Sequence, residues 1–264
     1  TARDFERVKN VILPEDEYKG VQAYTTYYYQ YFFTMLVMMF VIYDMFAQRD
    51  NGMWSITYSC ANGRIMYAIK QTGVIVVTGA FTHTLIYWST FIAAMLQRGG
   101  VRDLVNPVQT IETFDKFTYP WSKIKYVTVL YLISMVCIVA LCITIWGVFV
   151  MFRNRVYALV TMLIFAAVEQ FIYSHIDIHS VWNGLHYINI INIININATF
   201  SSYRNWGVGT YVFPVFSVVL FVHIICAGVI GYIAINVSAS MKPYKNTTFI
   251  KRFTDCVSAG CQKI

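Results

Sequence analysis

Long apolar runs separated by short polar segments set the pattern of this chain. A helix needs about 20 mostly apolar residues to cross the hydrocarbon core of a bilayer. Runs of that length cover about residues 29–47, 72–96, 126–152, 156–174 and 211–236. An odd number of spans places the two ends of the chain on opposite sides of the membrane. We therefore predict an all-α fold, a polytopic transmembrane helical bundle with five spans.

The same pattern divides the chain into three parts. Residues 1–28 are first charged and then rich in tyrosine, which is typical of the edge of a bilayer, and we expect them to be extracellular. Residues 29–236 form the predicted transmembrane domain, and residues 237–264 form a basic cytoplasmic tail. No signal-peptide pattern precedes the first polar stretch. We therefore expect the chain to begin partway through a longer protein, with a further span upstream.

A polar strip, residues 48–71, separates the first two spans. Gly52 allows a sharp exit from the first span, because glycine adopts backbone conformations closed to other residues. Met53 and Ile56 belong to a spaced apolar set that would form one side of a short helix. We expect that helix to lie along the membrane surface.

The second half of the strip reads as a break followed by a new helix. Asn62 and Gly63 are residues that end helices, and the segment from Arg64 to Lys70 leads into the second span. A cation at the start of a helix is disfavoured by the helix dipole, so Arg64 suggests an external anion or an acidic partner surface. The alternative is a simple anchor on the cytoplasmic side.

Composition and charge agree with a membrane protein. The chain is 58% hydrophobic and 12% charged, against about 25% charged for a soluble domain. Its net charge of +7 comes from basic residues that flank apolar runs and do not form a stripe with aromatic residues, so nucleic acid is not an expected partner. The basic residues are denser on the side of the polar strip, which favours a cytoplasmic strip and contacts with membrane lipids.

Four ionisable residues lie inside the predicted spans. Asp44, His83, Glu169 and His223 are candidates for a substrate path, because charges at such depth are costly and usually face a bundle interior or water. Each also has a simpler interpretation. Asp44 and Glu169 lie near span ends and could reach the interface, and a lone histidine is commonly hydrogen-bonded between helices.

A histidine-rich segment after the fourth span supports a different function. His175, Asp177 and His179 alternate along the chain, with Glu169 and His186 nearby, and such residues can bind metal. The rival hypothesis is an intramembrane metal-dependent enzyme. Metal sites also need further ligands and supporting residues, which the sequence does not identify, so our main prediction includes no catalytic residue and no metal ligand.

An isoleucine- and asparagine-rich stretch, residues 187–200, precedes the fifth span. Asn189, Asn192 and Asn195 recur at every third position. They could form a polar line along an external re-entrant or interfacial helix. A low-complexity loop is the equal alternative.

The residues that carry a family resemblance are, in order, Gln48-Arg49-Asp50-Asn51-Gly52, Ser59-Cys60-Ala61-Asn62-Gly63-Arg64 and Lys70. This order resembles the cytoplasmic coupling loop of type-2 ABC transporter permeases. Gln48 departs from that pattern, which commonly has Glu there, and any ion pair of that carboxylate would be absent or weakened. The resemblance implies six spans in the whole protein, of which this chain would lack the first.

The resemblance also implies a function, the permease subunit of an ATP-driven exporter in the plasma membrane, which we expect to be bacterial. Residues implied to couple to the ATP-binding subunit are Arg49, Asp50, Gly52, Met53, Ile56, Asn62, Gly63, Arg64 and Lys70. The chain has no G-x-x-x-x-G-K-[ST] loop, so ATP and Mg²⁺ are expected on that partner, and the chain itself is not expected to be an enzyme. A second permease copy or a paralogue would complete the transporter. A non-transporting sensor or immunity module is a further alternative.

Overall fold

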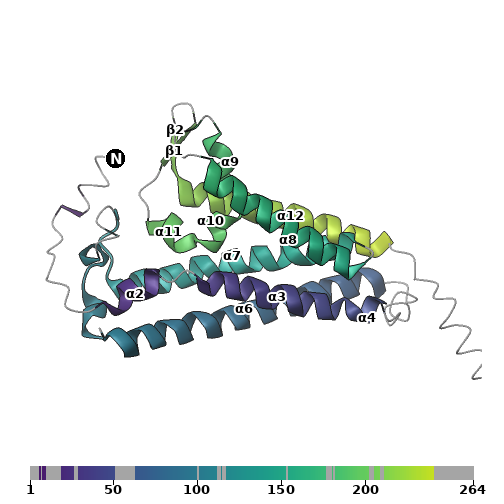
Figure 1. Cartoon of the computed structure of the whole chain (residues 1–264), viewed down its shortest axis with the longest axis horizontal. Coiled ribbons are helices and arrows are strands. Elements are labelled where there is room, and N and C mark those ends of the chain that lie inside the picture. The colour runs from purple at the N-terminus through teal and green to yellow at the C-terminus, as the bar shows by residue number, and fades with distance from the viewer. Residues whose placement is uncertain are drawn as a thin grey trace, which may run out of the picture.

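Figure 1 shows a computed structural model of the chain in which long helices run side by side. The residues that the structure describes are 6, 8, 9, 19–26, 29–50, 63–99, 101–111, 114, 117–152, 154–176, 180, 182–201, 205–208 and 211–240. Five described helices are long and apolar enough to cross a membrane. These are α3 (Tyr29–Met45), α6 (Gly63–Arg98), α7 (Lys123–Met151), α8 (Arg155–His175) and α12 (Val215–Ser240). The predicted all-α bundle with five spans is confirmed.

The second and fifth spans differ most from their predicted limits. α6 begins at Gly63, where the predicted break ends, and contains 36 residues, so the helix is longer than the predicted span of residues 72–96. At 1.5 Å per residue it is about 54 Å long, which exceeds the hydrocarbon core of about 30 Å. The predicted start of the fifth span at residue 211 is wrong, because Tyr211–Pro214 form strand β2 and α12 begins at Val215. Hydropathy alone does not separate a short apolar strand from a turn of apolar helix.

The remaining described elements are short. They are α2 (Gly20–Thr26), α4 (Ala47–Asp50), two 3₁₀ helices, η1 (Arg102–Val105) and η2 (Val108–Thr110), and then α9 (Asn183–Ile188), α10 (Ile191–Ile194), α11 (Ile196–Ser201), β1 (Asn205–Val208) and β2 (Tyr211–Pro214). Strands β1 and β2 pair as an antiparallel hairpin. We call the end of the bundle with α9–α11 and the hairpin the hairpin end (Figure 1). The opposite end, with Arg49, Arg64 and Arg155, is the basic end.

The segments outside the spans are partly described. In the N-terminal segment, α2 packs on α6, and the ring of Tyr24 meets the rings of Tyr87 and Phe91 edge to face at 5.4 and 5.3 Å. Residues 237–240 of the predicted tail continue α12. The rest of the tail lies outside the described residues.

Helix α7 occupies the centre of the bundle. It packs against α3, α6, α8 and α12, and its contact with α12 is the most extensive between any two described helices. In its apolar stretch 61% of the residues are buried, against 11% in α8. A short turn joins these two helices, and the Asn154 side chain caps α8 by accepting a hydrogen bond of 2.8 Å from the backbone nitrogen of Val156. Most of α8 is therefore left to face lipid or another protein.

Glycines let α7 approach its neighbours closely. A Cβ atom added to Gly147 would lie 2.4 Å from Cγ2 of Ile230 on α12, and one added to Gly231 would lie 3.0 Å from Cγ2 of Ile143. On α6, a Cβ atom at Gly79 would lie 2.5 Å from Sγ of Cys142. Membrane helices gain little from apolar burial against one another, because lipid is equally apolar, so close van der Waals contact at small residues stabilises their packing.

The substitution Gly147→Val should therefore destabilise the bundle. The added side chain collides with a branched carbon of Ile230 that is held near its backbone, so α7 and α12 must separate. Overpacking of this kind costs about 1–3 kcal/mol. We expect a lower unfolding temperature for the purified protein in detergent.

The matched control is Gly228→Val on the same helix as Ile230. A Cβ atom at Gly228 meets no described atom within 4 Å. Its unfolding temperature should stay near that of the unchanged protein. Equal losses in both variants would contradict the close contact between α7 and α12.

Candidate functional site

The polar strip begins and ends at the basic end of the bundle. Helix α4 leads into it and α6 leads out of it. Of the residues predicted to couple to a partner, Gly52, Met53, Ile56 and Asn62 lie outside the described residues. The others flank that gap: Arg49 and Asp50 on α4, and Gly63, Arg64 and Lys70 on α6.

Arg49 attaches the start of the strip to the end of α7. Its Nη1 donates hydrogen bonds to the carbonyl oxygens of Phe149 at 3.2 Å and Phe152 at 2.7 Å, and its guanidinium lies 4.7 Å from the ring centre of Phe46. The last carbonyls of a helix have no partners within the helix and carry its negative dipole end. Arg49 supplies both a donor and a positive charge at that point.

Arg64 lies against the end of α12. Its Nη1 is 3.5 Å from the carbonyl oxygen of Ala239, a long contact that is chiefly electrostatic. The helix start at Gly63 confirms that Arg64 sits in the first turn of α6. The negative end of α12 partly offsets the unfavourable dipole of α6 at this cation.

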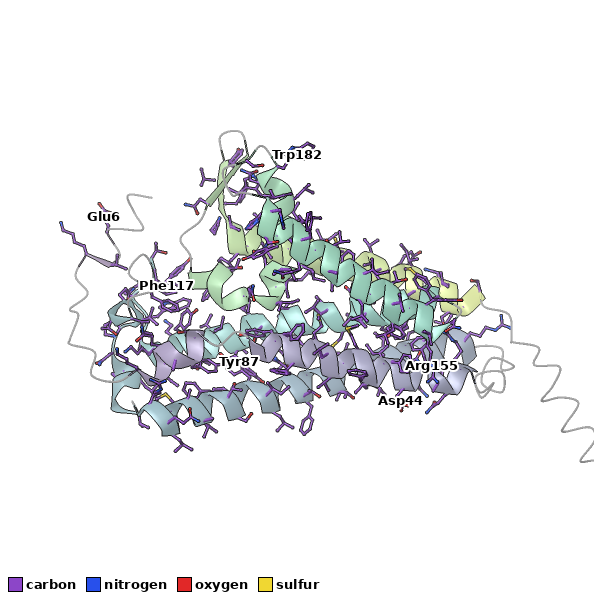
Figure 2. The ribbon with its side chains drawn as sticks, viewed as in Figure 1. Glu6, Asp44, Tyr87, Phe117, Arg155 and Trp182 are labelled. Atoms are coloured by element: carbon purple, nitrogen blue, oxygen red, sulfur yellow. The ribbon has the colours of Figure 1, made fainter. Side chains whose placement is uncertain are left out.

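The remaining cations of the basic end are nearer to solvent or to aromatic rings. Arg155 places its guanidinium 4.5 Å from the ring centre of Tyr43 on α3, and Lys70 is exposed. Gln48, which departs from the resemblance, is also exposed. Figure 2 shows Arg155 and Asp44 at the same end of the bundle. This end thus offers positive charge on both sides of the polar strip.

The four predicted path residues do not form one continuous path. Asp44 is exposed on α3, and His83 is fully buried on α6 among α3 and α7. Glu169 on α8 and His223 on α12 are half-buried, and Nδ1 of His223 lies 2.8 Å from the carbonyl oxygen of Val219 on its own helix.

His83 belongs to a buried polar contact between α6 and α7. Its Nε2 lies 2.8 Å from Oγ of Ser134, and its ring stacks on those of Tyr31 and Tyr131. One turn further along α6, the hydroxyl of Tyr87 donates to the carbonyl oxygen of Val127 at 2.7 Å. This arrangement matches the simpler interpretation, a histidine that is hydrogen-bonded between helices.

A second polar contact between these helices was missed from the sequence. Nε1 of Trp146 donates to Oε1 of Gln71 at 3.3 Å, and Gln71 is buried. Gln71 stands at the edge of a polar strip, so its neighbours in sequence did not indicate a position inside the bundle. The signal that could have found it is spacing, since Gln71, Ile75, Gly79 and His83 recur every fourth residue along one face of α6.

Glu169 fixes the asparagine-rich stretch to α8. Its Oε2 accepts a hydrogen bond of 3.0 Å from the backbone nitrogen of Ile190, and its carbonyl oxygen accepts one of 2.7 Å from Nδ2 of Asn189. Oδ1 of Asn189 then accepts from the backbone nitrogen of Ile191 at 2.8 Å. The carboxylate and the amide oxygen thus satisfy donors at the start of α10.

The asparagines break the stretch into short helices and do not line a single one. Asn189 separates α9 from α10, and Asn195 separates α10 from α11. Asn189 and Asn192 are buried, and Nδ2 of Asn192 donates to the carbonyl oxygen of His186 at 2.6 Å. The stretch is an ordered segment with internal polar contacts, and neither a continuous helix nor an unstructured loop.

The residues of the rival metal site are only partly described. Asp177 and His179 lie outside the described residues. Nδ1 of His175 is 3.0 Å from both the carbonyl oxygen of Phe171 and Oγ of Ser174, and His186 stacks on Tyr173. Within the described part of the chain, no group of three or more His, Cys, Asp or Glu residues could hold a metal ion.

The five candidate spans run alternately between the two ends of the bundle, and this arrangement decides the class of protein. It is a multi-pass helical membrane protein. No protein-family model, curated protein or solved structure matches the chain.

The contact at Glu169 yields a test of the site. Glu169→Ala should free the amide of Ile190 and loosen residues 189–201, because a lost helix cap costs about 0.5–2 kcal/mol. Hydrogen–deuterium exchange should rise in peptides from this stretch and stay unchanged in α7. Glu169→Gln, which keeps an oxygen acceptor, should show a smaller rise. Unchanged exchange in the alanine variant would show that Glu169 does not hold the segment.

Proposed function

We propose that this chain is the permease subunit of an ATP-driven ABC-type exporter and that it couples to a separate ATP-binding subunit through the polar strip. The main support for this proposal is that the residues on either side of 51–62 contact other spans. Arg49 contacts the end of α7 before the gap, and Arg64 contacts the end of α12 after it. A segment tied in this way can pass a displacement to helices distant in sequence.

The mechanism follows from these two attachments. The partner, carrying ATP and Mg²⁺, presses on Met53 and Ile56 of the strip, for which the sequence predicts a short helix, when it closes. Arg49 and Arg64 carry that displacement to α7 and α12, which pack closely against each other and which we expect to move as a pair. The result is a rigid-body rotation of packed helices, one of the established kinds of conformational switch.

The remaining partners are proposed from exposure and composition. Helix α8 is buried along only 11% of its apolar stretch, which leaves a long apolar face for membrane lipids or for a second permease copy or paralogue. Glu169 and His223 remain the proposed residues of a substrate path, because both are ionisable groups that are only half-buried within spans. The proposed location is the bacterial plasma membrane, with the basic end in the cytoplasm.

A sensor or immunity module is the competing function. Such a module needs no ATP-binding subunit. The proposed exporter therefore predicts that the full chain, purified from its own membranes in mild detergent, carries a P-loop ATPase with it.

The strip should carry that association. The double substitution Met53→Glu and Ile56→Glu places charges on the proposed docking helix and should remove most of the ATPase from the purified complex. Gln48→Glu is the matched control on the same strip, and it should retain the ATPase because it restores the family pattern. Purified protein without any ATPase, or equal retention in the double variant, would contradict the proposed function.

A further inference from the structure

An uncharged aromatic surface covers the outer part of the hairpin end. On β2, Tyr211 is 71% exposed and Val212 is 63% exposed, while Trp182, directly before α9, is 69% exposed and Leu185 on α9 is 50% exposed. All four lie outside the five candidate spans. We call this set, together with Phe213, the hairpin surface.

The residues of the hairpin surface are held in place by packing between the hairpin and α9. Trp206 on β1 pairs with Phe213 on β2, and Tyr211 shares the same side of the strand with Phe213 at a ring-centre distance of 6.4 Å. Trp206 also reaches α9, since a Cβ atom added to Gly184 would lie 3.6 Å from Cζ2 of its ring. The hairpin and α9 are therefore joined through Trp206, and Val212, on the opposite side of β2 from Tyr211 and Phe213, is exposed as well.

The chemistry of this surface suits a lipid boundary. Residues 182–214 contain no Asp, Glu or Lys and one Arg, Arg204. A protein-binding patch in water usually has a polar rim, whereas Trp and Tyr are enriched where a bilayer meets water because each has an apolar ring and a polar group. The exposed residues here include both of those ring types.

The position of the surface also indicates lipid. Strand β2 continues directly into α12 at Val215, so the hairpin stands at the level where a span begins. Figure 1 shows the hairpin and the end of α9 projecting to the side of the bundle at that level, and Figure 2 shows Trp182 at their outer edge. Lipid headgroups surround a membrane protein at the ends of its spans.

We propose that the hairpin and α9 insert their exposed aromatic and aliphatic side chains into the headgroup layer of the bilayer. The surface is an interfacial anchor whose ligand is phospholipid. It continues the lipid-facing surface of α12 outward along the plane of the membrane. This inference does not depend on the proposed transport function.

Spin labels test the anchor in the full chain. The labels are placed at Val212→Cys and, separately, at Leu185→Cys, in protein whose native cysteines are replaced, and each variant is reconstituted into phosphatidylcholine–phosphatidylglycerol vesicles. The control is Val101→Cys, a 74% exposed position after α6 at the same end of the bundle. Power saturation compares collisions with oxygen, which enters lipid, and with a water-soluble nickel complex.

We expect a several-fold higher ratio of oxygen to nickel collisions at residues 185 and 212 than at residue 101. A ratio at both sites equal to that of the control would place the surface in water and overturn the proposal. Protection from both reagents would also overturn it, because another protein copy would then cover the surface. Two label sites keep the test decisive if one substitution prevents folding.

Discussion

Close contact between α7 and α12 is the interaction on which the other parts of this fold depend. The hydrophobic effect, which packs the helices of soluble proteins together, is nearly absent between helices in lipid. The bundle therefore relies on close contact at glycines and on buried polar pairs. Gly147 and Gly231 bring the two helices together, while Gln71 and His83 link α6 to α7 through Trp146 and Ser134. Helix α8, without comparable contacts among the described residues, remains mostly exposed.

The sequence was sufficient to predict the spans and insufficient to predict their arrangement. Length and hydropathy located all five helices, because a helix that crosses a bilayer must be both long enough and apolar enough to do so. They did not identify α7 as the central helix, because lipid-facing and buried positions are equally apolar. They also placed the hairpin residues 211–214 inside a span. The start of α6 was predicted from the helix-ending residues Asn62 and Gly63, although Arg64 and Lys70 kept that first part outside the predicted apolar span.

The sequence singled out residues of the candidate site but did not predict the contacts that they make. Arg49 and Arg64 were selected as partner contacts, yet each contacts the end of another helix of the same chain. Glu169, selected for a path, caps α10, and His83 serves packing between helices. A charge in an apolar run therefore indicates a polar contact, but only the fold shows whether that contact is internal. Both arginine contacts converge on the α7–α12 pair, so a displacement of the strip would act on the centre of the bundle.

The central claim is that α7 and α12 meet at Gly147 and Ile230. Disulfide cross-linking tests it most directly, in protein whose native cysteines are replaced. Gly147→Cys with Ile230→Cys should cross-link readily on mild oxidation, because their side chains meet at the point of closest approach. The control pair, Gly147→Cys with Gly228→Cys, should not cross-link, because a Cβ atom at residue 228 has no described atom within 4 Å. Cross-linking in neither pair, or equally in both, would contradict this packing.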